Sequence, residues 1–281
     1  MAAASLTALS LTASASPAAA SVTIGQLAPA TPSVDCTGAD FDHVQPSVTS
    51  GTTYVVPPLP PASALVISSW SHNAAAAAGQ VLTMKVFRKV ADPATYVVVG
   101  HDGPRPLTAS TLNTFSASVP VKPGDVLGLN STAASMTGCA FPTPGESRLV
   151  RAGNLADGES GAFGSAPDRR LNVSAVVAPS NTFTLGEAKR NKKKGTATLT
   201  VDVPNPGELA LSGNGVKTAG AVAATTVTAP GAVELLVRAK GKKKRKLNET
   251  GKVKVKPKIT YTPTRGDAST QSLKVKLKKK L

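Results

Sequence analysis

The chain has 281 residues, of which 41% are hydrophobic, and it carries a formal net charge of +16. This length leaves room for two ordinary domains, and the apolar fraction is enough to bury a core in each, which excludes a chain that is disordered throughout. Aromatic residues make up only 4%, with a single Trp. Ala, Val, Thr, Ser, Gly and Pro are abundant instead, a composition that favours short strands and many turns over long helices.

The positive charge is concentrated in the last third of the chain. Residues 1–180 contain 9 Lys and Arg against 10 Asp and Glu, a net charge of −1, whereas residues 181–281 contain 23 against 6, a net charge of +17. Residues 178–180 (APS) stand where the charge changes. We therefore predict an N-terminal domain over residues 21–178 and a basic C-terminal domain over residues 181–281.

The first twenty residues have features of a signal peptide. Residues 6–15 form a short apolar stretch, and Ala18, Ala19 and Ala20 ahead of Ser21 give the A-x-A pattern of a signal-peptidase site. A positively charged n-region is missing, so the alternatives are a misassigned start codon and a disordered Ala/Ser tail. No later stretch approaches the roughly twenty apolar residues that span a membrane. We expect an extracellular or cell-surface protein.

Cysteine usage agrees with export. The chain contains Cys36 and Cys139, an even count without C-x-x-C spacing, which argues against a zinc ribbon or a thioredoxin-type motif. A single disulfide is the simplest interpretation, and two buried thiols are the alternative. The bridge would close a loop of about a hundred residues and restrict the unfolded chain by roughly 4–5 kcal/mol.

Short alternating segments separated by turn residues predict an antiparallel β-sandwich, jelly-roll-like or Ig-like, in the N-terminal domain. In residues 81–90, for example, Leu82, Met84 and Val86 share one face and Lys85 and Lys89 the other. Residues 101–104 (HDGP) predict a turn, and residues 120–124 (PVKPG) predict a hairpin. The predicted strands are residues 52–56, 64–70, 81–90, 95–100, 113–119, 125–130 and 170–177.

The same alternation continues in the basic domain, which we predict to be a smaller Ig-like β-sandwich. Val253, Val255 and Ile259 alternate with lysines, which must point to water if the strand is half buried. The fold class is thus all-β. The predicted strands are residues 183–185, 197–203, 209–211, 222–228, 232–239, 253–261 and 273–277.

Several motifs carry a resemblance to known modules. In the C-terminal hundred residues they are residues 181–183 (NTF), 192–196 (KKKGT), 197–203 (ATLTVDV), 211–213 (LSG), 250–256 (TGKVKVK) and 259–264 (ITYTPT). This part resembles the Lys-rich Ig-like or fibronectin-type-III-like module that recurs in secreted actinobacterial proteins. The N-terminal part is similar to uncharacterised exported domains of such proteins at residues 23–25, 68–71, 99–105, 112–115 and 120–129. The resemblance implies an exported protein of two β-modules and implies no particular activity.

Two compact clusters of cations fall between predicted strands and are expected in loops. There they could present several charges to a phosphate or carboxylate polymer, the alternative being an ordinary solvated surface. Nucleic acid is disfavoured because base stacking needs aromatic platforms, and this domain offers Phe183 and Tyr261, both expected in the core. The candidate polyanion-binding residues are Lys192, Lys193, Lys194, Lys242, Lys243, Lys244, Arg245 and Lys246.

The N-terminal domain contains all three histidines but no recognisable catalytic or metal-binding pattern. His43, His72 and His101 lack the spacing of a ligand pair, and residues 40–43 are expected to form a polar loop near the disulfide. The acidic residues that could accompany the histidines are Asp35, Asp40, Asp42 and Asp102. We therefore predict no metal site and no cofactor.

Sequence motifs for catalysis are also missing. The chain contains no G-x-S-x-G, and residues 158–164 (GESGAFG) have glycines without the Lys-Ser/Thr ending of a phosphate loop. The sequence therefore predicts an exported, non-catalytic protein whose basic module associates with anionic cell-envelope polymers. The alternatives are a carbohydrate-binding or metal-dependent enzymatic N-terminal domain, which the single Trp70 disfavours as a sugar platform, and a nucleic-acid-binding protein, which the leader and the cysteine pair disfavour.

Overall fold

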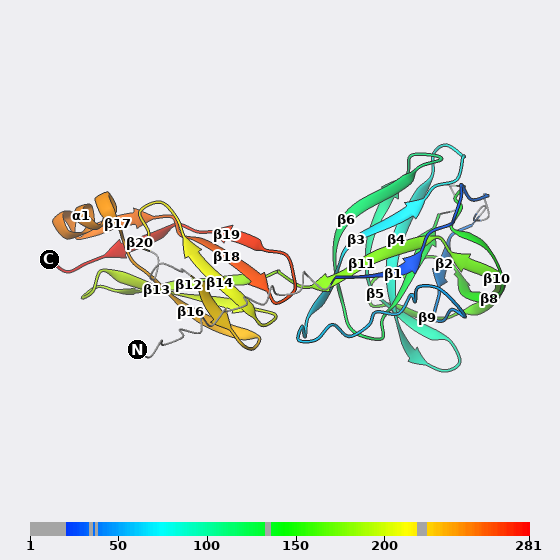
Figure 1. The fold of residues 1–281 in the computed structure, drawn as a ribbon, viewed down its shortest axis with the longest axis horizontal. Helices are drawn as coiled ribbons and strands as arrows, with labels where there is room; N and C mark the ends of the chain where they lie inside the picture. The colour runs from blue at the N-terminus through cyan, green and yellow to red at the C-terminus, as the bar shows by residue number, and fades with distance from the viewer. Residues whose placement is uncertain (1–20, 34–35, 37–38, 133–135, 218–223) are drawn as a thin grey trace, which may run out of the picture.

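The computed structural model describes residues 21–33, 36, 39–132, 136–217 and 224–281, and it confirms the predicted all-β, sandwich-type fold (Figure 1). Every pairing between named strands in these ranges is antiparallel. The predicted signal peptide and the start of the predicted strand over residues 222–228 lie outside the described residues. In the described part of the chain, no helix has both the length and the apolar character needed to cross a bilayer.

The N-terminal region, residues 21–178, contains two sheets around one apolar core that extends from Ile24 to Val177. The first sheet has the order β1-β11-β3-β6 and is formed by β1 (Val22–Gln26), β11 (Val173–Pro179), β3 (Leu65–Asn73) and β6 (Leu112–Val121). The second has the order β10-β8-β2-β7-β4-β5-β9 and is formed by β10 (Gly164–Leu171), β8 (Ala140–Ala152), β2 (Phe41–Val44), β7 (Val126–Ser131), β4 (Val81–Ala91), β5 (Thr95–Pro106) and β9 (Ser160–Ala162).

Several local predictions for this region are wrong. Residues 52–56 form no regular strand, although Val55 makes a single bridge to Val126. Residues 101–104 lie inside β5, where a register shift against β4 between Leu82 and Met84 accommodates them without a turn. The turn at residues 120–124 connects the two sheets and forms no hairpin, because β6 pairs with β3 and β7 with β2 and β4. Residues 40–43 were expected to form a polar loop, but residues 41–44 form β2.

The C-terminal region, residues 181–281, has its own apolar core, which extends from Phe183 to Leu277. One sheet consists of β12 (Thr184–Asn191), β13 (Thr196–Val203) and β16 (Gly231–Val237). A second has the order β15-β14-β18-β19 and consists of β15 (Ala224–Val227), β14 (Gly207–Ser212), β18 (Lys258–Pro263) and β19 (Ser269–Ser272). The remaining elements are the pair β17 (Lys252–Val255) and β20 (Val275–Lys278) and the helix α1 (Gly241–Thr250).

The predicted alternation is confirmed in β17 and in β16. Val253 and Val255 are buried whereas Lys252 and Lys254 are exposed, and Leu235 and Val237 are buried on β16. Since successive side chains of a strand point to opposite faces, the apolar residues supply the core and the lysines face the solvent. The strand pattern thereby places a row of cations beside α1.

A buried asparagine connects the two regions. The Oδ1 atom of Asn205, in the turn before β14, accepts hydrogen bonds from the backbone N–H groups of Ser63 and Ala64, both at 2.8 Å. Its Nδ2 atom donates to the carbonyl oxygens of Ala64 (2.9 Å) and Ser180 (3.0 Å). The Tyr261 hydroxyl donates to the Asn205 carbonyl oxygen at 2.7 Å, and burial raises the pKa of Tyr261 to about 12. The Ser63 hydroxyl also donates to Oδ1, at 3.4 Å. The polar contacts of the Asn205 side chain are thus made on the far side of the boundary or at the boundary itself.

Candidate functional site

The first predicted basic cluster forms the turn between β12 and β13. Asn191 accepts the backbone N–H of Lys194 at 3.0 Å, and the carbonyl oxygen of Lys192 accepts the N–H of Lys280 at 2.9 Å. Gly195 has a φ of 65°, and a Cβ atom there would lie 3.1 Å from a methyl carbon of Leu247. A glycine therefore allows the turn to pack closely against α1, which carries Leu247.

The second predicted cluster lies on a helix, whereas a loop was expected. Residues 242–246 occupy the first turns of α1, because Lys and Arg are good helix formers and the buried Leu247 anchors the helix to the core. Gly251, in the left-handed conformation, ends the helix. The first turn contains no acidic residue, so the partial positive charge of the helix N-terminus adds to that of the lysines. This end of α1 is a strongly positive surface.

The turn and the helix meet at a cleft of about 630 Å³, which we call the cationic cleft. Lys194 reaches it from the turn and Lys244 from α1, so the structure brings the two sequence clusters together. None of the described residues that line it is Asp or Glu, and Leu236, which is 43% exposed, adds an apolar surface. The cations of the cleft are Lys194, Lys217, Arg238, Lys244 and Lys279.

A second, smaller cleft of about 360 Å³ lies on another side of α1, against β17 and β20. It is lined by Val253 and by the cations Lys243, Lys246, Lys252, Lys254 and Lys276. Four residues of the two predicted clusters line neither cleft. They are Lys192, Lys193, Lys242 and Arg245. Sequence reasoning missed Lys217, Arg238 and Lys279, and it placed Lys252 and Lys254 only on the solvated face of a strand. Arg238 directly follows β16 and Lys279 directly follows β20, so the signal available for these two was a cation at the end of a predicted strand.

The aromatic side chains do not form a binding platform in the described residues. Phe183 and Tyr261 are buried in the C-terminal core and pack edge to face with ring centroids 5.9 Å apart. Trp70 is 1% exposed and donates its indole N–H to Asp102 at 2.7 Å. Base stacking and sugar stacking both need an exposed ring face, and neither surface offers one through these residues.

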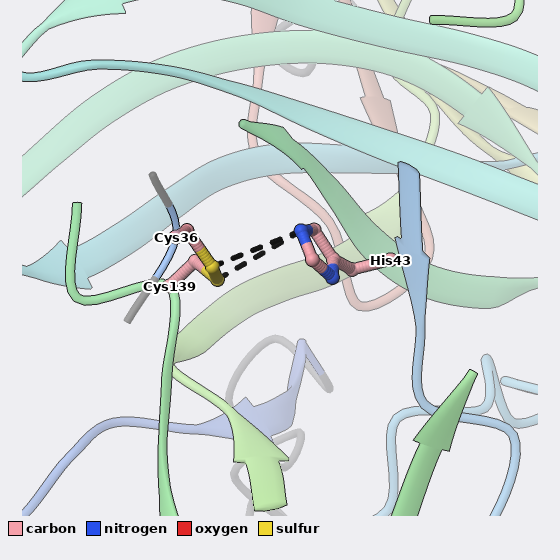
Figure 2. Close-up of side chains that lie close together, drawn as sticks. All are labelled: Cys36, His43 and Cys139. Atoms are coloured by element: carbon pink, nitrogen blue, oxygen red, sulfur yellow. Dashed lines mark hydrogen bonds between the residues drawn. A yellow bond between two sulfur atoms is a disulfide. The ribbon is translucent and has the colours of Figure 1, made fainter. Parts of the chain in front are cut away.

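Cys36 and Cys139 are joined in the N-terminal core, which confirms the predicted disulfide (Figure 2). Both cysteines are buried. Cys36 forms an isolated antiparallel β-bridge with Thr137, and Cys139 directly precedes β8. Figure 2 shows the imidazole of His43, on β2, pointing at the two sulfur atoms, with Nε2 at 3.8 Å from each Sγ. Ser131 Oγ, at the end of β7, lies 3.1 Å from the same nitrogen.

The interior keeps His43 neutral. Its side chain is almost fully buried, and burial, with a smaller contribution from the charge of Arg148, lowers its pKa to about 3. In the described residues, its Nδ1 atom has no hydrogen-bond partner. The neutral ring therefore directs a nitrogen at the sulfur pair over the whole physiological pH range.

The histidines and acidic residues considered from the sequence lie in separate environments. His72 contacts the Asn172 carbonyl oxygen at 2.6 Å through Nδ1, and its pKa falls to about 4, mainly because of burial. His101 is exposed and pairs with Asp157 at 2.8 Å. Asp42 binds Lys85 at 2.7 Å, and Asp35 lies outside the described residues. Among the described residues, the group whose ligand atoms lie within 4.8 Å of one another is Cys36, His43 and Cys139.

Comparisons with protein-family models, with curated proteins and with solved structures give no match.

Proposed function

We propose that the chain is an exported, non-catalytic extracellular or cell-surface protein whose basic C-terminal region binds anionic cell-envelope polymers. The cationic cleft carries the proposal, because five cations from four separate segments of the chain converge on it without an acidic residue among the described lining. Like charges repel when gathered, so such a site is stabilised by an anion that bridges them. The expected ligand group is a phosphate or carboxylate repeated along a polymer.

A repeating polyanion suits this surface better than a compact anion. The two clefts border the same helix, with Lys244 at one and Lys243 and Lys246 at the other. A chain of regularly spaced charges can contact both, and multivalent contact raises the overall affinity without any strong individual bond. The buried positions of Phe183 and Tyr261 argue against the nucleic-acid alternative, because single strands are bound through stacking on exposed rings.

Charge reversal inside the cleft tests the proposal. We expect the full chain to bind poly(glycerol phosphate), with neutral dextran as the negative control, and the double substitution Lys194→Glu with Lys244→Glu to weaken binding roughly 100-fold at low salt. Each lost attraction at the surface is worth about 0.7 kcal/mol and each reversed charge adds repulsion of the same order, so the two substitutions together cost about 2.8 kcal/mol. The measurement is a titration at two ionic strengths, in which binding of the wild-type chain weakens as salt is added.

The chain offers a matched control for this experiment. Lys192→Glu with Lys242→Glu changes the net charge by the same amount, also on the turn and on α1, but neither residue lines a cleft. We expect the fold-loss of affinity caused by this pair to be at least about tenfold smaller than the loss caused by the cleft pair. Equal losses of affinity in the two double variants would show that binding follows net charge alone. Binding to dextran as strong as binding to the polyanion would contradict the proposal.

Export is tested separately by fractionation of the producing cell into cytosol, envelope and medium, followed by N-terminal sequencing. We expect the product in the envelope or the medium with Ser21 as its first residue, because the sequence places the signal-peptidase site after Ala20. Envelope-bound protein should be released by salt if the basic region holds it there. Intact protein confined to the cytosol would rule out export.

A further inference from the structure

We propose that Cys36, Cys139 and His43 form a zinc site that exists only when the disulfide is reduced. Two thiolates and one imidazole are among the preferred ligands of Zn²⁺, and three protein ligands with a fourth position for another group are a common arrangement. All three side chains are buried in the same core, and their ligand atoms lie within 4.8 Å of one another. The proposal rests on this cluster and is independent of the cationic cleft.

The distances from His43 already match those of a tetrahedral zinc centre. With Zn–S near 2.3 Å and Zn–N near 2.0 Å, a tetrahedral site separates the ligand nitrogen from each sulfur by about 3.5 Å. The observed separation between Nε2 and each Sγ is 3.8 Å. The change required is the separation of the two sulfurs to about 3.8 Å once their bond is broken, because that is the distance between two thiolates on one tetrahedral zinc.

Ser131 is the candidate for the fourth coordination position. An oxygen and a nitrogen bound to the same tetrahedral zinc lie about 3.3 Å apart, and Ser131 Oγ is 3.1 Å from Nε2. The hydroxyl itself, or a water molecule that it holds, would complete the coordination. The ligands thus come from four places in the fold: His43 from β2, Ser131 from the end of β7, Cys139 from the segment before β8, and Cys36 from its isolated β-bridge with Thr137.

The charge of the complex suits its buried position. Two thiolates balance the two charges of Zn²⁺ and the imidazole is neutral, so the complete site carries no net charge and avoids the large penalty for burying an ion. An empty pair of buried thiolates would lack this balance, so we expect metal binding and deprotonation to be coupled.

The disulfide and the zinc complex exclude each other. A thiol or phosphine reductant supplies two electrons, the S–S bond breaks, and two protons from water complete two thiols. Zinc then displaces both protons and forms two Zn–S bonds and one Zn–N bond. The sulfurs of the intact disulfide carry no thiolate charge, so the oxidised protein is expected to bind no zinc at this position.

The test uses the full chain, oxidised and phosphine-reduced, with zinc affinity measured by competition against a chromophoric chelator. We expect the oxidised chain to bind no zinc. The reduced chain should have two titratable thiols before zinc is added and should bind one zinc. Cobalt as a spectroscopic substitute should give a thiolate charge-transfer band and the visible bands of a tetrahedral ion. His43→Gln keeps both cysteines but should weaken zinc binding more than about 100-fold, because loss of groups outside the ligand set already costs 10- to 100-fold.

His101→Gln is the control, since His101 is exposed and pairs with Asp157, and it should leave the zinc affinity unchanged. Reduction removes the constraint of the disulfide, so folding is followed in parallel by Trp70 fluorescence. If the reduced chain unfolds, zinc should refold the wild-type chain and fail to refold His43→Gln. Equal zinc affinity in the wild type and in His43→Gln, or zinc bound to a chain that remains unfolded, would overturn the proposal.

Discussion

Lowering the pH from 7 to 5 is expected to reduce the free energy of unfolding of the N-terminal region by about 4 kcal/mol. Burial lowers the pKa of His43 to about 3 and that of His72 to about 4, from an ordinary value of 6.5. Below pH 6.5 the unfolded chain therefore binds two protons that the folded chain does not bind, which favours unfolding. Each histidine contributes about 2 kcal/mol to the loss at pH 5.

Unfolding in urea, followed by the fluorescence of Trp70, measures this effect in the N-terminal region alone, because the chain contains one Trp. His72→Gln retains an N–H donor for the Asn172 carbonyl oxygen and removes one titrating group. We expect the loss between pH 7 and pH 5 to fall to about 2 kcal/mol in this variant. An undiminished loss would exclude His72 as a source of the pH dependence.

Carboxylates extend the acid sensitivity to lower pH without changing its sign. Burial by itself would raise the pKa of Glu146, but hydrogen bonds from Thr49 and the charge of Arg170 outweigh it and hold the pKa below its usual value. A lowered carboxyl pKa gives stability that is present above the unfolded value and is lost as the pH falls through the folded value. These groups act below about pH 4.5, so the histidines account for the range from 7 to 5. No histidine occurs after residue 180, which makes the C-terminal region an internal control.

Alternation of apolar and polar residues predicted the strands whose one face is solvated, and it failed where both faces are covered. In β17 the lysines face the solvent, as the pattern predicted. In β4 the pattern placed Lys85 and Lys89 together on a polar face, but Lys85 is 3% exposed and binds Asp42. Lys85 and Asp42 lie 43 positions apart in the sequence. Strand β2, which carries Asp42, was not predicted because its polar residues are buried in such pairs. Propensity and periodicity are local, whereas this burial depends on long-range pairing.

The same limit explains which parts of the two sites could be predicted. The cysteine pair followed from its number alone, and residues 40–43 were expected near the disulfide, but no spacing rule predicts that the His43 imidazole points at both sulfur atoms. The lysine clusters were visible as local runs. Their convergence on one cleft was not, because it requires Leu247 to pack α1 against the turn at Gly195. Composition therefore identified the kinds of residue involved, and tertiary packing decided which of them act together.

Lys85→Ala is expected to lower the free energy of unfolding of the N-terminal region by about 3–5 kcal/mol. The ammonium group donates to Asp42 at 2.7 Å, and to Asn154 Oδ1 and the Leu155 carbonyl oxygen, both at 2.6 Å. Its removal leaves the fully buried carboxylate of Asp42 without a counter-charge, although Leu155 N and Asn130 still donate to it. An uncompensated buried charge is costly because the interior solvates it poorly. Urea unfolding followed by Trp70 fluorescence measures the loss.

Lys89→Ala is the matched control, since Lys89 lies on the same strand and pairs with Asp92 at the surface. Solvent screens that pair, so its removal should leave the unfolding free energy within experimental error. Adding Asp42→Asn to Lys85→Ala removes the unpaired charge and should recover part of the stability. If the two lysine substitutions cost the same, or if Asp42→Asn recovers nothing, the loss comes from side-chain packing and the buried charge of Asp42 is not its cause.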